Sequence, residues 1–201
     1  MSDQLSLMGF EAPPPAVPTD RLFFALQPSA AACAQITALG EALRQTHGLH
    51  SKLIAPERLH ITLHHLGDHA GVPADLVEAA GRAAARMVCP PFDVVLDHAM
   101  SFRMRRDKAP FVLRTAEGQD GALMDFQREL GLAMAREGLG HSVDVRFTPH
   151  VTLTYAPREL PESPVEPVRW TVREFVLIHS LLGKTEHRVL GRWSLPAPSQ
   201  A

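Results

Sequence analysis

The sequence has little cysteine, no long apolar run and no excess of either charge. Cys33 and Cys89 are the only two cysteines in 201 residues, too few for a disulfide scaffold or a thiolate zinc site. No stretch approaches the roughly 18 apolar residues that a membrane span needs, and the polar beginning lacks the regions of a signal peptide. The 20 basic and 22 acidic residues nearly balance, which excludes binding through bulk positive charge. We therefore expect a cytoplasmic protein with no membrane partner.

The remaining composition suits one compact domain. Hydrophobic residues make up 45% of the chain, enough to bury a core. Residues 1–19 contain four prolines without periodicity and predict a flexible leader. We expect a single domain over residues 20–197, either one compact unit or two small lobes that share a core region, and a short tail over 198–201. We also expect a monomer.

Hydrophobic periodicity predicts the elements of this domain. Apolar residues at spacings of three and four predict helices at 29–46, 73–88 and 120–138. Apolar runs and alternating segments predict strands at 21–26, 58–66, 92–96, 109–114, 146–156, 170–182 and 188–195. The Pro- and Glu-rich segment 157–167 is interpreted as a surface loop. This order predicts an α+β fold with two similarly built halves.

One short pattern occurs twice on predicted strands. His-x-Thr-Leu stands at residues 60–63 and again at 150–153, 90 positions later. Residues i and i+2 of a strand share a face, so each histidine lies beside its threonine while the aliphatic residues face a core. Two imidazoles and two hydroxyls on such faces predict a cleft.

Imidazole and hydroxyl groups in this pattern favour chemistry at a phosphodiester. A neutral histidine accepts a proton from an attacking water, and a protonated one donates to a departing oxygen. The hydroxyls of Thr62 and Thr152 are expected to donate hydrogen bonds to phosphoryl oxygens. In-line displacement at phosphorus then needs one histidine on each side, and His60 and His150 are the candidates.

Several neighbouring residues are further candidates for the cleft. His64 shares the predicted face of His60 and Thr62, whereas His65 is expected to pack with the aliphatic residues. A three-histidine metal site of His60, His64 and His150 is the weaker interpretation, because it leaves the threonines without a role. One of two adjacent aromatic residues on the first strand is expected to face the cleft and stack a base, and Phe24 is our candidate.

These segments resemble the 2H phosphoesterases, most closely the bacterial RNA 2′,3′-cyclic phosphodiesterases, historically called 2′-5′ RNA ligases. The resemblance covers Asp20 to Leu195 and is carried by RLFFALQP, HITLHHLGD, FQREL, FTPHVTLTY and SLLGKTEHRVLGRWSL. It implies two pseudo-symmetric lobes of antiparallel sheet, helices packed outside and an active cleft between the lobes.

The resemblance also implies an enzyme that opens a 2′,3′-cyclic phosphate at an RNA end to a 2′-phosphate, without metal or cofactor. In such enzymes the second-motif histidine activates water and the first protonates the leaving ribose oxygen. That assignment makes His150 the proton acceptor and His60 the proton donor. The sequence itself does not orient the pair.

The chain departs from this family at one position. Tyr155 stands where many members have arginine two residues after the second motif's leucine. A basic loop between two predicted strands could supply the missing charge, and we take Arg105 as its candidate, with Arg103, Arg106 and Lys108 as alternatives. A solvated hairpin tip is the competing interpretation of this loop.

Other functions remain open for the same residues. Joining RNA ends through a 2′-5′ linkage is the reverse reaction and needs the same two histidines. Another 2′-5′ or cyclic nucleotide phosphodiesterase would use them as well. A non-catalytic RNA-end-binding module is disfavoured, because arginine or lysine would serve a purely binding role.

Overall fold

The computed structural model describes residues 17–103, 107–116, 118 and 120–196. The bulk of the predicted leader and tail lies outside these residues, so both stay predictions. The described chain forms, in order, β1 (Asp20–Leu26), α1 (Ala30–Thr46), η1 (Pro56–Arg58), β2 (Ile61–His69), α2 (Ala74–Ala85), β3 (Phe92–Ser101), β4 (Ala109–Arg114), α3 (Gly121–Arg136), η2 (Gly140–Ser142), β5 (His150–Ala156), β6 (Ser163–Val172), β7 (Glu174–Leu181) and β8 (Glu186–Ser194).

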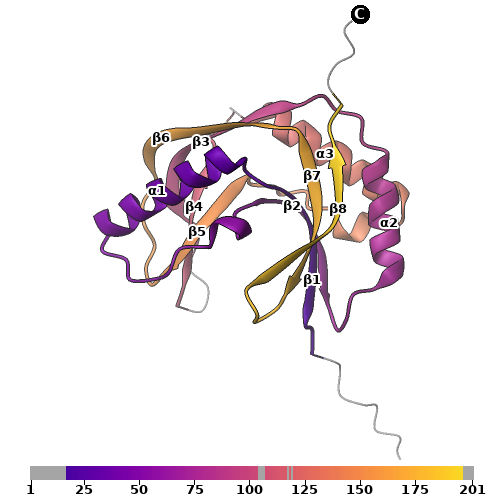
Figure 1. The fold of residues 1–201 in the computed structure, drawn as a ribbon, viewed down its shortest axis with the longest axis horizontal. Coiled ribbons are helices and arrows are strands. Elements are labelled where there is room, and N and C mark those ends of the chain that lie inside the picture. The colour runs from indigo at the N-terminus through magenta and orange to yellow at the C-terminus, as the bar shows by residue number, and fades with distance from the viewer. Residues whose placement is uncertain (1–16, 104–106, 117, 119, 197–201) are drawn as a thin grey trace, which may run out of the picture.

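The strands form two four-stranded antiparallel sheets (Figure 1). The first has the order β2-β1-β7-β8 and the second the order β5-β4-β3-β6. Both motif strands, β2 and β5, lie at a sheet edge, and the two contact each other. The predicted α+β fold with two lobes is confirmed, and the motif strands lie where the lobes meet.

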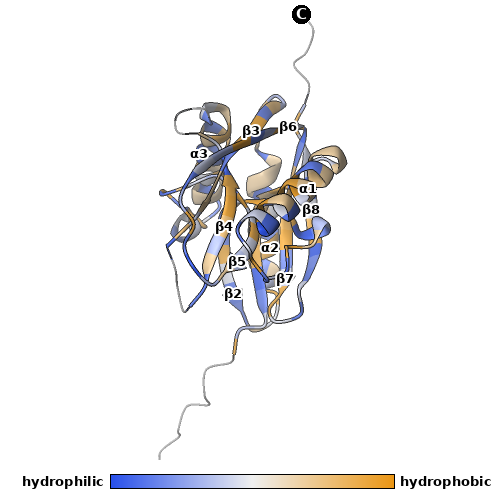
Figure 2. Cartoon of the chain, turned by 90° about the vertical axis from the view of Figure 1, so that its left-hand side faces the viewer, coloured by the Kyte–Doolittle hydropathy of each residue, from blue (hydrophilic) through white to orange (hydrophobic). Residues whose placement is uncertain are grey.

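The helices tie the two sheets together. α1 follows β1 of the first sheet but packs on β5 and β6 of the second (Figure 1). α3 follows β4 of the second sheet but contacts β2 of the first as well as β3, and α2 packs beside it against β8. One continuous apolar core joins these layers, and Figure 2 shows the hydrophobic residues concentrated on the central strands.

Local sequence signals account for the helix ends. The Ser29 hydroxyl accepts a hydrogen bond from the backbone N–H of Ala32 at 3.2 Å, which caps α1 as its position predicts. α3 begins after Asp120 as expected, although the Asp120 side chain makes no capping bond. Gly138, at a φ of 84°, follows the last turn of α3.

One predicted loop is wrong. β6 begins at Ser163, inside the segment 157–167 that was interpreted as a surface loop. Its prolines are tolerated because β6 is the edge strand of the second sheet, where one side of the backbone needs no ladder partner. The predicted strand 170–182 is two strands, since β6 ends at Val172 and β7 begins at Glu174. Arg173 alone therefore joins the two sheets at this point.

Candidate active site

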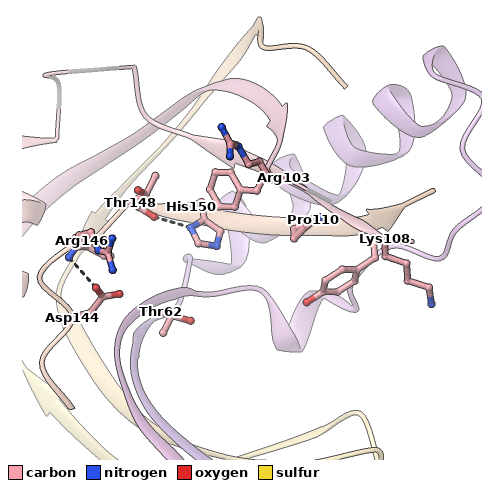
Figure 3. Close-up of a pocket in the computed structure, with 11 residues that line it drawn as sticks. Thr62, Arg103, Lys108, Pro110, Asp144, Arg146, Thr148 and His150 are labelled. Atoms are coloured by element: carbon pink, nitrogen blue, oxygen red, sulfur yellow. Dashed lines mark hydrogen bonds between the residues drawn. The ribbon is translucent and has the colours of Figure 1, made fainter. Parts of the chain in front are cut away.

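The two motif histidines are held in the same way. The Nδ1–H of His60 donates to the carbonyl oxygen of Arg58 at 2.7 Å. The Nδ1–H of His150 donates to the carbonyl oxygen of Thr148, also at 2.7 Å, as Figure 3 shows. A carbonyl oxygen only accepts, so the proton of each neutral ring is on Nδ1. The Nε2 atoms have no hydrogen-bond partner in the described part of the chain and are free to meet a ligand.

The structure brings the four predicted motif residues to one cavity. His60, Thr62, His150 and Thr152 line a cavity of about 520 Å³, with walls from both sheets. A second cavity of about 780 Å³ shares Thr62, His150 and Tyr155 with the first (Figure 3). The motif histidines thus lie along one continuous cleft.

Cross-lobe hydrogen bonds fix the first motif beside the second. The backbone N–H of Ile54 donates to the carbonyl oxygen of Leu153 at 2.7 Å. The Thr154 hydroxyl lies 2.8 Å from the carbonyl oxygen of Lys52, to which it donates. The segment that leads into the first motif is therefore fastened to the strand that carries the second.

Each motif histidine packs against an aromatic ring. The ring centroids of Phe23 and His60 lie 4.9 Å apart, and those of Phe102 and His150 lie 4.7 Å apart. Phe102 was not a candidate in the sequence, because it lies in the connection after β3 and outside any periodic pattern. These contacts restrict the orientation of both imidazoles.

The prediction for Phe24 is wrong, and Phe23 takes the expected position. Phe24 is completely buried in the main core, where its ring packs near Phe175 and Trp193. Alternation along β1 places Phe24 with the aliphatic residues on the helix-covered face and leaves Phe23 to line the cleft.

The predictions for His64 and His65 are also wrong, because a β-bulge interrupts β2. Thr62 pairs with Ala25 and His64 pairs with the preceding residue of β1, so Leu63 is the extra residue. Beyond the bulge the faces are exchanged. His64 is completely buried, while the half-exposed His65 lines the cleft.

β5 carries a bulge at the equivalent position. Thr152 pairs with Val112 and Thr154 with Phe111, so Leu153 is the extra residue. Thr154 is therefore buried, whereas Tyr155 is 49% exposed and lines both cavities. Regular alternation with Val151 and Leu153 would place Tyr155 on the core face instead.

His64 serves the core rather than the cleft. Its Nδ1 accepts from the backbone N–H of Asp144 at 3.2 Å, and its Nε2–H donates to the carbonyl oxygen of Gln127 at 2.9 Å. Burial lowers the pKa of His64, so the neutral ring with both nitrogens satisfied is the favoured form. A metal site that includes both His64 and the motif histidines is ruled out by this placement.

Positive charge lines both cavities. Arg105 and Arg106 lie outside the described residues, but Arg103 and Lys108 of the same loop line the larger cavity (Figure 3). Sequence reasoning missed Arg146 in the larger cavity and Arg58 and His187 in the smaller one. Extending the motif alternation back along the two predicted strands to Arg58 and Arg146 could have found these two residues. Nothing in the local pattern around His187 marks it, because the chain's folding alone brings it to the cleft.

Burial governs the electrostatics of the imidazoles. It lowers the pKa of His150, and it lowers the pKa of His60, which the positive charges of His150 and Arg58 lower further. The ring centroid of His187 lies 5.4 Å from that of His60. Burial, followed by the charges on His60 and Arg58, lowers the pKa of His187 to about 4. A positive charge on one imidazole thus lowers the pKa of the imidazole beside it.

Metal-binding clusters and membrane-spanning helices are both absent from the described ranges. No group of three or more His, Cys, Asp or Glu within these residues is arranged to hold a metal ion. No helix among them has the length and apolar character needed to cross a membrane.

Comparison with known proteins places this arrangement in a family. The sequence model of the 2′-5′ RNA ligase superfamily matches residues 28–184, well over half of the chain. The chain belongs to this superfamily, the class of 2H phosphoesterases. No curated protein matches the chain in a sequence search.

Solved structures share its fold. LigT from Escherichia coli, solved in complex with 3′-AMP, is 26% identical with a TM-score of 0.64, and the match covers 89% of this chain and 99% of LigT. TT0787 from Thermus thermophilus is 24% identical with a TM-score of 0.66 over the same shares. Usb1 from Kluyveromyces marxianus is 14% identical with a TM-score of 0.51, covering 88% and 99%. The last two show the fold alone, while family and fold together indicate a phosphodiesterase-type enzyme.

Proposed function

We propose that this protein hydrolyses the terminal 2′,3′-cyclic phosphate of RNA to a 2′-phosphate by acid–base catalysis with two histidines. One observation carries the proposal. His60 and His150 come from different lobes, are held by matching Nδ1 hydrogen bonds and line one cavity, so both Nε2 atoms can meet the same phosphate. LigT, a similar protein, has been solved with 3′-AMP and with phosphate.

In this mechanism the two imidazoles act on opposite sides of phosphorus. The Nε2 of His150 takes a proton from water as the water oxygen bonds to phosphorus. The bond from phosphorus to O3′ breaks, and the protonated Nε2 of His60 donates its proton to O3′. The products are a 2′-phosphate and a free 3′-hydroxyl, and proton exchange with solvent restores both rings.

Thr62 and Thr152 are proposed to bind the phosphate. Both threonines line the cavity two residues after their histidines, and their hydroxyls make no hydrogen bond to other described residues. Donation from these hydroxyls to the non-bridging oxygens would stabilise the negative charge that shifts onto them during displacement. Because threonine is uncharged, the pKa values of His60 and His150 are set by burial and by the charged groups described above.

The proposal is tested on a 2′,3′-cyclic-phosphate-ended oligonucleotide in EDTA-treated buffer. We expect the cyclic phosphate to be converted to the 2′-phosphate. Phosphorus NMR measures this conversion. His60→Ala and His150→Ala should each lower kcat by roughly 100-fold or more, the size of a lost general acid or base. The matched control is His141→Ala, an exposed histidine of η2 outside both cavities, which should keep full activity.

Two results would contradict the proposal. Full activity in both single variants would show that neither histidine takes part in the reaction. A 3′-phosphate product would mean that the other ribose oxygen leaves, and the assignment of the broken bond would be wrong.

A further inference from the structure

The cavity that holds both motif histidines contains two arginines, and one of them already has a partner. Arg21 forms a double hydrogen bond with Asp68, with 2.7 Å from Nε to Oδ1 and 2.7 Å from Nη2 to Oδ2. This carboxylate neutralises the Arg21 charge and fixes the guanidinium plane. Arg21 is therefore poorly available to a second anion.

Arg58 differs from Arg21 in every one of these respects. Its side chain makes no hydrogen bond or ion pair to any described residue, and its Nε is a buried atom without a partner. A buried guanidinium donor left unsatisfied is costly, so such a group calls for a ligand. Its position two residues before His60, at the end of η1, places it in the wall of the same cavity.

The charge of Arg58 opposes the protonation of its neighbours. Besides His60 itself, the titratable or charged groups that line this cavity are Arg21, Arg58, His65, His150, Tyr155 and His187. Burial lowers the pKa of His60 and of His187, and the positive charge of Arg58 lowers both further. An unpaired cation beside an imidazole that must carry a proton is thus a disadvantage, unless an anion lies close to both.

A phosphodiester anion removes this conflict. One negative charge in the cavity attracts the guanidinium and the imidazolium together, so the two cations no longer act only against each other. The guanidinium donors also match the geometry of phosphate oxygens. Tyr155, which lines the cavity from the other lobe, provides no positive charge.

We propose that the Arg58 guanidinium binds the substrate phosphate in the cavity shared by His60 and His150. This inference rests on the proposed function, since it names the group that holds the phosphate in that reaction. The backbone carbonyl of Arg58 orients the His60 ring and its side chain holds the anion on which that ring acts. One residue would thereby align the acid and the phosphate.

Inorganic phosphate and a 2′,3′-cyclic nucleotide are the two probes of this inference. Phosphate binding is measured by calorimetry, and turnover is measured across pH. We expect Arg58→Ala to raise the Kd for phosphate and the KM by about tenfold or more, the size of a charge-assisted hydrogen bond, with a smaller change in kcat. The alkaline limb of kcat/KM should move to higher pH, because the pKa of His60 rises when the neighbouring cation is removed.

A second substitution separates phosphate binding from a structural role. Tyr155→Arg, added to Arg58→Ala, returns a guanidinium to the cavity from the opposite lobe and should restore phosphate binding. The matched control is Arg169→Ala, an exposed arginine of β6 outside both cavities, which should change neither quantity. Arg58→Met keeps the apolar stem without the charge and replaces Arg58→Ala if thermal unfolding shows that the alanine variant is not folded.

Each outcome decides one of the two proposals. Unchanged phosphate binding in a folded Arg58 variant overturns the role of Arg58 while wild-type turnover still supports the phosphodiesterase. Loss of binding without restoration by Tyr155→Arg in a folded protein also overturns it. Absence of turnover in the wild type, combined with Arg58-dependent phosphate binding, overturns the proposed reaction and leaves the anion site standing.

Discussion

Each motif histidine is oriented by the carbonyl oxygen of the residue two positions before it. Fixing Nδ1 in this way leaves Nε2 free to meet a ligand in both lobes. The sequence predicted the four motif residues that the structure brings to one cavity, because two copies of one pattern on alternating strands are hard to explain otherwise. It left out Arg58 and Arg146, although both stand on the histidine face of their predicted strands, and it could not predict His187, which reaches the cleft through tertiary contacts.

The lowered histidine pKa values predict an acidic optimum for activity. In the proposed reaction His60 acts as the acid and must be protonated, so activity falls as pH rises through its pKa. His150 must be neutral to act as the base, so activity falls as pH drops through its own. Burial lowers both pKa values from 6.5, which places the optimum of kcat/KM for a cyclic nucleotide below pH 6.5. A pH–rate profile with its maximum above about pH 7 would contradict this.

At the scale of elements, the two bulges explain why strand alternation failed where it did. Alternation is reliable up to Thr62 and Thr152, and it is inverted beyond Leu63 and Leu153. No residue type at these positions announces a bulge, since leucine is common in regular strands. The positions of His65 and Tyr155 could therefore be learned only from the pairing of β2 with β1 and of β5 with β4.

The buried His64 also constrains the helix that covers it. Gly131 lies inside α3, and a Cβ built there would come 3.0 Å from Cγ1 of Val143 and 3.2 Å from Cε1 of His64. We expect Gly131→Ala to destabilise the protein by about 1–3 kcal/mol, because overpacking outweighs the better helix propensity of alanine. Urea unfolding followed by circular dichroism measures the change.

Gly81 in α2 provides the matched control. A Cβ at Gly81 meets no atom within 4 Å, so Gly81→Ala should stabilise the protein by about 0.5–1 kcal/mol through helix propensity alone. Equal stabilisation by both substitutions would show that α3 does not pack closely against His64.

At the scale of the whole molecule, neither sheet is independent of the other. The first sheet combines β1 and β2 with β7 and β8 from the far end of the chain, while β3 to β6 form the second. α1 leaves the first sheet to cover the second, and one apolar core runs through both. The sequence predicted most of these elements from periodicity, but not β6 in a Pro-rich segment or the single-residue connection at Arg173.

The two tryptophans allow this dependence to be measured lobe by lobe. Trp170 lies in β6 of the second sheet and Trp193 in β8 of the first. Single-tryptophan variants, Trp170→Phe and Trp193→Phe, should each show one fluorescence transition in urea that coincides with the loss of helical circular dichroism in the same variant. Fluorescence that changes well before or after the helical signal would mean that the lobes unfold separately.

Each of the paired bulges also separates the residues of the motif from a residue of the cavity wall that follows a few positions later. The residues before each bulge carry the motif histidine and threonine, and the third residue after each threonine forms part of the cavity wall. Replacing His65 or Tyr155 would change the shape and charge of that wall while the Nδ1 hydrogen bonds of His60 and His150 stayed as they are. Substitutions at these two positions would therefore change substrate preference without moving the motif histidines.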